Sequence, residues 1–394
     1  MGKISYNKIK GHFPVLFIAL LGVFVGLSFV YLGPDLPISS DFWDVYKPAA
    51  ESLSKGEGFG LYEGAPNIKA MPIFPIFVAI VYYFGGGIRE FAAFQSLFLA
   101  GIGIFAYLLA KMYLSKKIAI FAALNIMLWP YFILYTKLIY TEVIFVFFLL
   151  LAVYCLSRFM KEDTYKYAIL AGVFLAIATL TRAVIFLLPL WIFFSYLLVR
   201  KEIIKEYFSW KKWGVLLIAF MIVLSPWLVR NYIHYNTFVI AEGLEGMFRK
   251  SYVNYDYVHL DDKPIPASER TLKKHITSRI KNIYLFWNPG AGGKYTETLQ
   301  EKLPGASAFI YMYGGFFLMI LGLAFLSITW AWRNKHIFLL WSIILYFWTV
   351  HIFLFPYPRY TLPIIPLVII LAWLIIQKTF LSRIDKEAET IDKK

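Results

Sequence analysis

The sequence predicts an all-α polytopic membrane protein with about ten transmembrane helices. Of its 394 residues, 60% are hydrophobic and only 16% are charged. Its mean hydropathy of +0.65 lies outside the usual range of soluble domains. Apolar runs of roughly 17 to 25 residues recur along the chain, which is the length that an α-helix needs to cross the hydrocarbon core of a bilayer. Because unpaired backbone groups are costly in lipid, these runs are predicted to be helices.

The first apolar run, residues 13–32, follows three lysines and resembles a signal peptide. It is long for the apolar region of a signal peptide, and no cleavage site with small residues follows it. We therefore expect a retained first span, with the chain forming a single transmembrane domain over residues 1–394.

The positive charges decide the orientation of the spans. With the amino terminus inside, the inner segments hold 21 Lys and Arg residues, against 8 in the short outer segments and 10 in the long outer loop. Short loops obey the positive-inside rule, so 21 against 8 places both termini, including the tail at 379–394, on the cytoplasmic side of the plasma membrane. The predicted spans lie near residues 13–32, 91–110, 118–135, 141–158, 166–181, 183–199, 213–230, 306–330, 337–355 and 359–377.

The apolar stretch at 71–90 is predicted to be a re-entrant or interfacial segment. Counting it as a span would move Lys111, Lys116 and Lys117 to the outer side. Its two prolines, Pro72 and Pro75, and the glycine run at 85–87 also suit a segment that does not cross.

The net charge of +15 is accounted for by this topology, because the basic residues cluster between the apolar runs. We expect the lipid bilayer as a partner and no nucleic acid. The single cysteine, Cys155, lies in an apolar run, which excludes a disulfide framework and a thiolate metal site. The six histidines show no paired ligand spacing, so no metal site is predicted. The sequence indicates no particular cofactor. It does not decide whether a divalent cation is required.

Two hydrophilic outer regions result, the first outer loop at 33–70 and a large outer loop at 233–305. In the second, lysines and arginines from Lys273 to Lys281 alternate with apolar residues from Leu272 to Tyr284 at helical spacing. This pattern predicts an amphipathic helix. It either lies on the membrane surface or is solvated and packed on the outer domain.

Six ionisable residues fall at the outer ends of the predicted spans. Charges at mid-bilayer cost about 2.5 to 3.5 kcal/mol on insertion scales, so charges held near an interface are candidates for function. These residues come from distant parts of the chain: Asp41, Asp44, Glu142, Arg182, Arg230 and Arg359.

The three acidic residues each allow two interpretations. Asp41 starts a predicted juxtamembrane helix, and it either caps that helix together with Asp44 or serves as a catalytic carboxylate. Glu142 opens an apolar span, where the helix dipole alone favours a carboxylate. Because Glu142 falls on the same side as Asp41, the two carboxylates can also divide the roles of base and orienting group.

The three arginines are candidates for binding a phosphate. Guanidinium groups bind phosphate oxygens in a planar, bidentate manner that lysine cannot match. Each arginine can instead be an interfacial residue whose side chain extends to the headgroups.

At these same residues, the chain resembles membrane glycosyltransferases of the GT-C fold, in the protein-mannosyltransferase-like and aminoarabinose-transferase-like group known as glycosyltransferase family 39. The resemblance lies in short blocks spread over most of the chain, and their order and spacing carry it. The blocks are Asp41 to Ala49 with Leu53 and residues 56–58, residues 71–75, residues 140–142, residues 180–182, Pro226-Trp227 with Arg230-Asn231-Tyr232, and Arg359-Tyr360 through Pro363 with Pro366.

The resemblance implies an inverting transferase that takes a sugar from a polyprenyl-phosphate-linked donor on the outer face. It implies that Asp41 is the catalytic carboxylate and that Arg182, Arg230 and Arg359 bind the donor phosphate, with Asn231 and Tyr360 beside them. Glu142 would orient the acceptor or a cation. Relatives often carry a second acid where this chain has Phe42, so the partner role of Asp44 stays open.

The acceptor class implied by the resemblance is a glycan, a lipid or a protein. A polyprenyl lipid tail is expected in apolar grooves beside the segment at 71–90. The alternatives to a transferase are a transporter or flippase of lipid-linked sugars, since intramembrane charges also mark transport paths, and a scaffold without catalytic activity.

Overall fold

The architecture comes from a computed structural model, which describes residues 2–38, 40–60, 67–199, 209–236, 238–241, 271–288, 306–354 and 358–381. The predicted cytoplasmic tail lies outside these ranges from residue 382 onward. Most of the predicted outer loop at 233–305 also lies outside them, and only residues 233–236, 238–241 and 271–288 of that loop are described.

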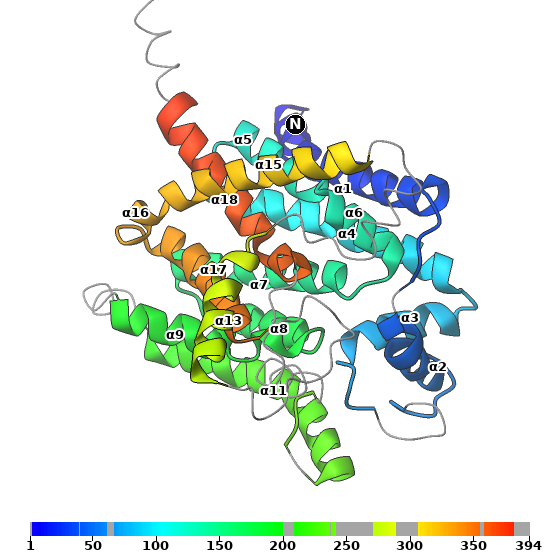
Figure 1. Ribbon diagram of the computed structural model, residues 1–394. Helices are drawn as coiled ribbons and strands as arrows, with labels where there is room; N and C mark the ends of the chain where they lie inside the picture. Colours follow the sequence, from blue (N-terminus) through cyan, green and yellow to red (C-terminus); the bar gives the residue numbers. More distant parts are fainter. Residues whose placement is uncertain are drawn as a thin grey trace, which may run out of the picture.

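Every regular element in the described part of the chain is helical, as Figure 1 shows. Helices α1 to α9 are α1 (Gly2–Leu32), α2 (Lys47–Ser54), α3 (Ile73–Tyr83), α4 (Ile88–Ala110), α5 (Lys116–Met127), α6 (Pro130–Leu138), α7 (Glu142–Glu162), α8 (Tyr165–Thr179) and α9 (Leu188–Val199). The later ones are α11 (Trp210–Tyr235), α13 (Leu272–Leu285), α15 (Ala306–Leu326), α16 (Ile328–Ala331), α17 (Lys335–Phe353) and α18 (Ile365–Ile376). Short 3-10 or π segments are η1 (Phe42–Tyr46), η3 (Ala183–Ile185), η5 (Pro358–Ile364) and η6 (Gln377–Leu381).

The chain is a multi-pass integral membrane protein. Within the described residues, seven helices are long and apolar enough to cross a membrane, and a bent pair, α5 with α6, brings the number to eight. Shorter apolar helices at Tyr165–Thr179 and Ala183–Leu198 occupy two more of the predicted positions. Each of the ten predicted spans therefore coincides with a helix or helix pair.

The span predicted at 118–135 is not one straight helix. Its two halves, α5 and α6, meet at an angle of 42°. Pro130 causes the break, because a proline disfavours the helical conformation of the residue before it, and Trp129 is extended with φ −61° and ψ 124°. The bend places α6 beside the candidate site described below.

Helix α3 occupies the predicted re-entrant or interfacial segment. It holds 11 residues, which span only about 17 Å at 1.5 Å per residue and are too few to cross a hydrocarbon core of about 30 Å. It packs against α2 (Figure 1), and the backbone N–H of Ile73 at its start donates to the carbonyl of Leu180 at 3.1 Å. The start of α3 is thereby attached to the end of α8.

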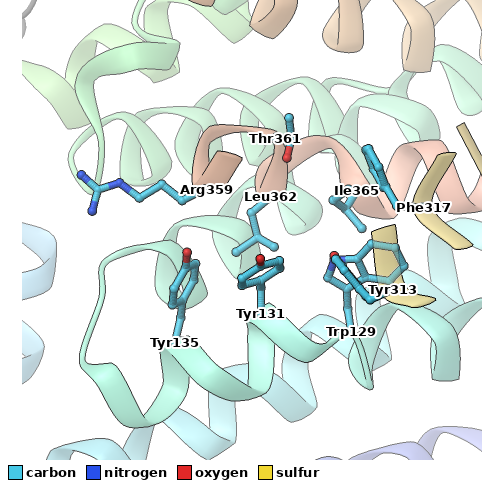
Figure 2. Close-up of a pocket in the computed structure, with 9 residues that line it drawn as sticks. All are labelled: Trp129, Tyr131, Tyr135, Tyr313, Phe317, Arg359, Thr361, Leu362 and Ile365. Carbon is cyan, nitrogen blue, oxygen red and sulfur yellow. The ribbon is translucent and has the colours of Figure 1, made fainter. Parts of the chain in front are cut away.

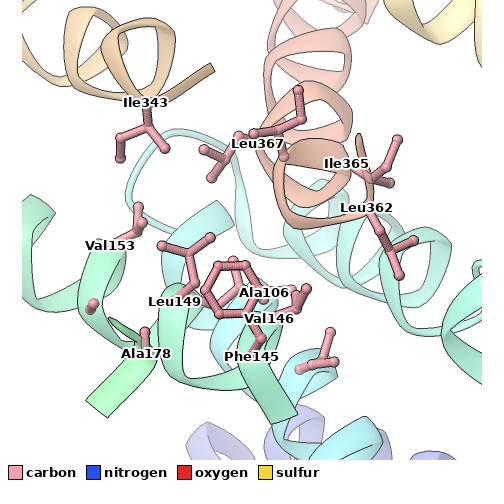
Figure 3. Close-up of a cluster of buried hydrophobic side chains, with 14 of the residues drawn as sticks. Ala106, Phe145, Val146, Leu149, Val153, Ala178, Ile343, Leu362, Ile365 and Leu367 are labelled. Atoms are coloured by element: carbon pink, nitrogen blue, oxygen red, sulfur yellow. The ribbon is translucent and has the colours of Figure 1, made fainter. Parts of the chain in front are cut away.

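The core surrounds α7, which runs through the middle of the bundle. Figure 3 shows Phe145, Val146, Leu149 and Val153 of this helix packed among side chains of α4, α8, α17 and α18. Helix α1 differs from α7, because most of its large apolar side chains are exposed. In a membrane protein such side chains face lipid, so α7 is shielded by protein and α1 lies at the lipid boundary.

Small residues bring α1 against α4. A Cβ atom added to Gly22 would lie 2.7 Å from the Cα of Ala100, and one added to Gly26 would lie 2.5 Å from Oγ of Ser96. The two glycines are four residues apart, which is the spacing that lets membrane helices approach closely. This contact fixes the end of α1, from which the chain continues to Asp41.

Candidate functional site

A buried carboxylate with two arginines forms the centre of the candidate site. Glu142 begins α7 and is 1% exposed. Its Oε1 lies 2.6 Å from Nη1 of Arg182 and 3.8 Å from Nε of Arg359. One carboxylate between two guanidiniums leaves this group of three residues with a net positive charge. Removing one partner of such a buried pair costs about 3 to 5 kcal/mol, so these side chains hold each other in place.

The three residues come from three separate turns of the chain. Arg182 follows the end of α8, and Arg359 belongs to η5, the 3-10 segment before α18. Glu142 is preceded by Ile139, which ends α6 in the left-handed conformation with φ 58°. That conformation is unfavourable for a β-branched residue, by about 1 to 3 kcal/mol, and such strain persists where the surrounding structure requires it. Here it turns the chain sharply from α6 into α7.

Thr141 links the carboxylate to one of the arginines. Its Oγ1 donates to Oε2 of Glu142 at 3.3 Å and accepts from Nη1 of Arg182 at 3.1 Å. The threonine is buried. It therefore restricts the orientation of both charged groups, which is the arrangement that a preorganised anion site needs.

Aromatic rings lie beside both guanidiniums. The ring centre of Tyr360 is 5.4 Å from Cζ of Arg182 and 5.4 Å from Cζ of Arg359. Tyr140 lies 5.3 Å from Arg359. These distances suit cation–π attraction. The side chains of Arg182 and Arg359 remain 20% and 27% exposed beside these rings.

Asp41 shares a charged neighbourhood with this cluster through Tyr46 in η1. Burial raises the pKa of Tyr46 to about 12. This value already includes the guanidiniums of Arg182 and Arg359, which lower the pKa, and the carboxylates of Asp41 and Glu142, which raise it. The phenol therefore stays protonated at neutral pH. The side chain of Asp41 makes no capping hydrogen bond to η1, so the structure does not support the capping interpretation of this residue. Asp44 is exposed on the same turn.

Arg230 binds the loop that precedes α3 instead of the cluster. Its Nη1 donates to the carbonyl of Asn67 at 2.8 Å and to Oδ1 of Asn231 at 2.9 Å, and its Nη2 donates to the carbonyl of Phe59 at 2.7 Å. Nδ2 of Asn231 in turn donates to the carbonyl of Val239 at 2.8 Å. These bonds connect the end of α11 with the loop before α3 and with the chain at Val239.

Asn67 ties that loop to the segment that carries Asp41. Its Nδ2 donates to the carbonyl of Val45 in η1 at 3.2 Å, and its Oδ1 accepts from the backbone N–H of Lys69 at 2.8 Å. Asn67 is fully buried. Arg230 and Asn67 together fix the position of η1 relative to α11.

A groove of about 900 Å³ opens beside α3. Its lining combines apolar side chains of α3 and α11, such as Ile76 and Val223, with polar residues including Glu57, Arg230 and His234. The groove reaches Leu180, two residues before Arg182. It lies where the sequence predicted a groove for a lipid tail, and its mixed lining suits an amphiphile.

Arg359 also lines a small cavity of about 20 Å³. The cavity has room for about one water molecule. Figure 2 shows Trp129, Tyr131 and Tyr135 in a row on the α6 side, facing Arg359 and Leu362 of η5. Helix α15 closes the cavity with Tyr313 and Phe317. The break before α6 sets this aromatic row against the charged cluster.

Of the residues predicted from the sequence, the structure thus brings Glu142, Arg182, Arg359 and Tyr360 into contact. Among the residues that the sequence analysis assigned no role are Tyr46, Asn67 and Thr141. Thr141 could have been identified from the sequence, because it is a polar residue next to the predicted charge of Glu142. The roles of Asn67 and Tyr46 are recognisable only from tertiary contacts. No group of three His, Cys, Asp or Glu residues that could hold a metal ion occurs in the described ranges.

Comparisons with known proteins agree with the predicted resemblance. The family model "Dolichyl-phosphate-mannose-protein mannosyltransferase" matches residues 69–229, which include α3, α7 and Arg182. A search of curated protein sequences finds no match.

Two solved structures share the fold. ArnT from Cupriavidus metallidurans, bound to undecaprenyl phosphate, aligns with a TM-score of 0.60 and 12% identity, over 96% of this chain and 62% of ArnT. The archaeal oligosaccharyltransferase AglB from Archaeoglobus fulgidus, in complex with an inhibitory peptide and a dolichol-phosphate, aligns with a TM-score of 0.57 and 13% identity, over 95% of this chain and 52% of AglB. The chain has the GT-C fold and spans less than two thirds of the length of either protein.

Proposed function

We propose that this chain is an inverting glycosyltransferase that transfers a sugar from a polyprenyl-phosphate-linked donor to a hydroxyl of an acceptor. The observation that carries the proposal is the buried Glu142 with Arg182 and Arg359 on a GT-C fold, together with Asp41, whose charge acts on Tyr46 as theirs do. The family model that matches the chain is that of a transferase using a lipid-linked sugar, and both similar structures hold a polyprenyl phosphate.

The arginines of the cluster bind the donor phosphate. Glu142 and Thr141 hold Arg182 from one side, and Tyr360 packs between the two guanidiniums. Charged groups fixed in this way need no reorganisation when negative charge develops on a leaving phosphate, and such preorganisation is usually the largest catalytic contribution. Glu142 thus positions the arginines, and through them it orients the substrates.

Asp41 acts as the general base. Its carboxylate accepts the proton of the acceptor hydroxyl while that oxygen attacks the anomeric carbon of the sugar. The bond between the anomeric carbon and the phosphate oxygen breaks, and polyprenyl phosphate leaves with the electron pair. One displacement inverts the anomeric configuration. A single positioned base contributes about 10²- to 10⁴-fold to such a step.

The groove beside α3 holds the polyprenyl chain. Its lining includes apolar residues of α3 and α11, which suit isoprene units, and it includes Leu180, two residues before Arg182, where the phosphate would sit. Arg230 and Asn231 support the groove from the side of the outer loops, because their side chains hold the carbonyls of Phe59, Asn67 and Val239. The acceptor is a glycan, a lipid or a protein. The positive-inside bias places both termini in the cytoplasm and the site on the outer face of the plasma membrane.

A reconstituted transfer assay tests this proposal. The full chain in liposomes, given a panel of polyprenyl-phosphate-linked sugars and hydroxyl acceptors, is expected to release one polyprenyl phosphate for each glycosylated product, as measured by mass spectrometry. Liposomes without the protein are the control. Movement of the intact lipid-linked sugar between leaflets without any release would identify a flippase and refute the transferase assignment.

A further inference from the structure

Helix α13 attaches to the end of α17 through its polar side. Nδ2 of Asn282 donates to the carbonyl of Ile352 at 3.0 Å, and Nη1 of Arg279 donates to the carbonyl of Phe353 at 2.8 Å. These carbonyls belong to the last turn of α17, where no intrahelical donor is available. The side chains of α13 therefore cap a spanning helix.

Two further contacts fix the rotation of α13 about its own axis. The backbone carbonyl of Ile283 accepts from Nε1 of Trp348 in α17 at 2.9 Å. Phe286, directly after α13, is buried and stacks on His351 with ring centres 5.3 Å apart. His351 in turn lies 4.9 Å from the ring of Tyr360. Helix α13 is thus held at several points and lies on the same side of the bundle as the charged cluster.

The side of α13 turned away from α17 is apolar and exposed. Leu272 is 75% exposed, Ile276 50% and Ile280 58%. Ile283 and Tyr284 continue the same stripe and are also exposed. We define these five residues as the apolar stripe of α13. A helix packed on a soluble outer domain would bury such residues, whereas α13 exposes them and buries Ser278 and Asn282.

The end of α17 marks a membrane boundary. Its 19 residues span about 28 Å, close to the thickness of the hydrocarbon core. Trp287 and Trp348 pack together at this end, with ring centres 5.6 Å apart, and tryptophans favour the interface between lipid and water. The exposed Lys273 and Lys274 beside the stripe are the residue type that anionic headgroups attract.

We propose that α13 lies in the membrane surface on the side of the charged cluster, with its apolar stripe embedded in lipid. The polar contacts with α17 hold the stripe outward, the length of α17 places it at the interface, and the lysines suit the headgroup layer. This inference stands independently of the glycosyltransferase proposal, because it concerns only how the helix meets the bilayer.

Site-specific fluorescence tests the proposal on the full chain. The chain has one cysteine, Cys155, so a Cys155→Ala background accepts a single new label. An environment-sensitive fluorophore is attached to Ile280→Cys, and to Lys274→Cys as the matched control on the same helix, about 120° away around its axis. Both variants are reconstituted in vesicles of phosphatidylcholine and phosphatidylglycerol that contain nitroxide-labelled lipid.

The nitroxide lipid is expected to quench the label at position 280 about twofold more strongly than the label at position 274, and aqueous iodide is expected to show the reverse order. Stronger iodide quenching at 280 would mean that the stripe faces water. Weak quenching at 280 by both agents would mean that other parts of the protein cover it. Equal quenching at the two positions by the nitroxide lipid would mean that the helix has no lipid-facing side. Each of these three results overturns the proposal.

Discussion

Asp41→Asn is expected to lower turnover with a lipid-linked sugar by about 10²- to 10⁴-fold, the range for loss of one general base. Asparagine has nearly the size and shape of aspartate, so the packing around η1 is retained, but its amide cannot take the proton of the acceptor hydroxyl. The KM for the donor is expected to change little, because the proposed contact of Asp41 is with the acceptor. Steady-state kinetics of the purified variant measure both quantities.

Asp44→Asn is the matched control for this substitution. Asp44 lies three residues further along the same segment and is exposed as Asp41 is. The charges that act on Tyr46 include Asp41, Glu142, Arg182 and Arg359 but not Asp44, so the loss of Asp44 is expected to affect turnover far less. A comparable loss in both variants would assign the base to the two acids jointly. Full turnover in Asp41→Asn would remove Asp41 from the mechanism.

Arg359→Ala is expected to reduce kcat/KM for the donor by about 10²- to 10³-fold, as the loss of one preorganised charge donor does in other enzymes. The side chain approaches Glu142 to 3.8 Å and packs on Tyr140 and Tyr360. Its guanidinium is thus held where the leaving phosphate is proposed to lie. Donor binding should weaken more than acceptor binding, as measured by varying each substrate separately.

Two variants control for this result. Arg158→Ala removes an arginine that pairs with Glu162 at the opposite end of α7, a partly exposed pair of the kind that contributes little, and its activity should be unchanged. Arg359→Lys keeps the charge without the planar fork and is expected to recover only part of the activity. Weaker acceptor binding with intact donor binding in Arg359→Ala would contradict the phosphate assignment.

The positions of the spans were predictable from the sequence because the bilayer imposes one dominant requirement on every crossing segment, a long apolar helix. Among the described residues, eight of the ten predicted spans coincide with a helix or bent helix pair long enough to cross a membrane, and the other two coincide with shorter apolar helices. The bend between α5 and α6 was missed, although Pro130 signals it, because the apolar composition continues across the proline and hydropathy does not register backbone geometry.

The cluster was only partly predictable. Glu142, Arg182 and Arg359 stood out because charges are rare at the ends of apolar spans. Arg230 stood out for the same reason, yet its guanidinium donates to carbonyls of the loop before α3. Which charge faces which neighbour depends on how distant helices pack, and hydropathy patterns contain no information about that packing.

The surroundings of Tyr46 could not be predicted from the sequence either. A tyrosine within a juxtamembrane helix looks like an ordinary packing residue, and only the folded chain reveals that Asp41 and the buried cluster act on the same phenol. Its pKa of about 12 keeps it neutral at the pH of any ordinary assay, so its hydroxyl is available as a hydrogen-bond donor throughout.

The anomeric configuration of the product tests the central claim most directly. A donor of known configuration is transferred by the purified chain, and the new glycosidic bond is examined by NMR spectroscopy. Direct displacement with Asp41 as base predicts inversion, with polyprenyl phosphate as the other product. Retention of configuration would require two displacements through a covalent sugar intermediate and would contradict the proposed mechanism.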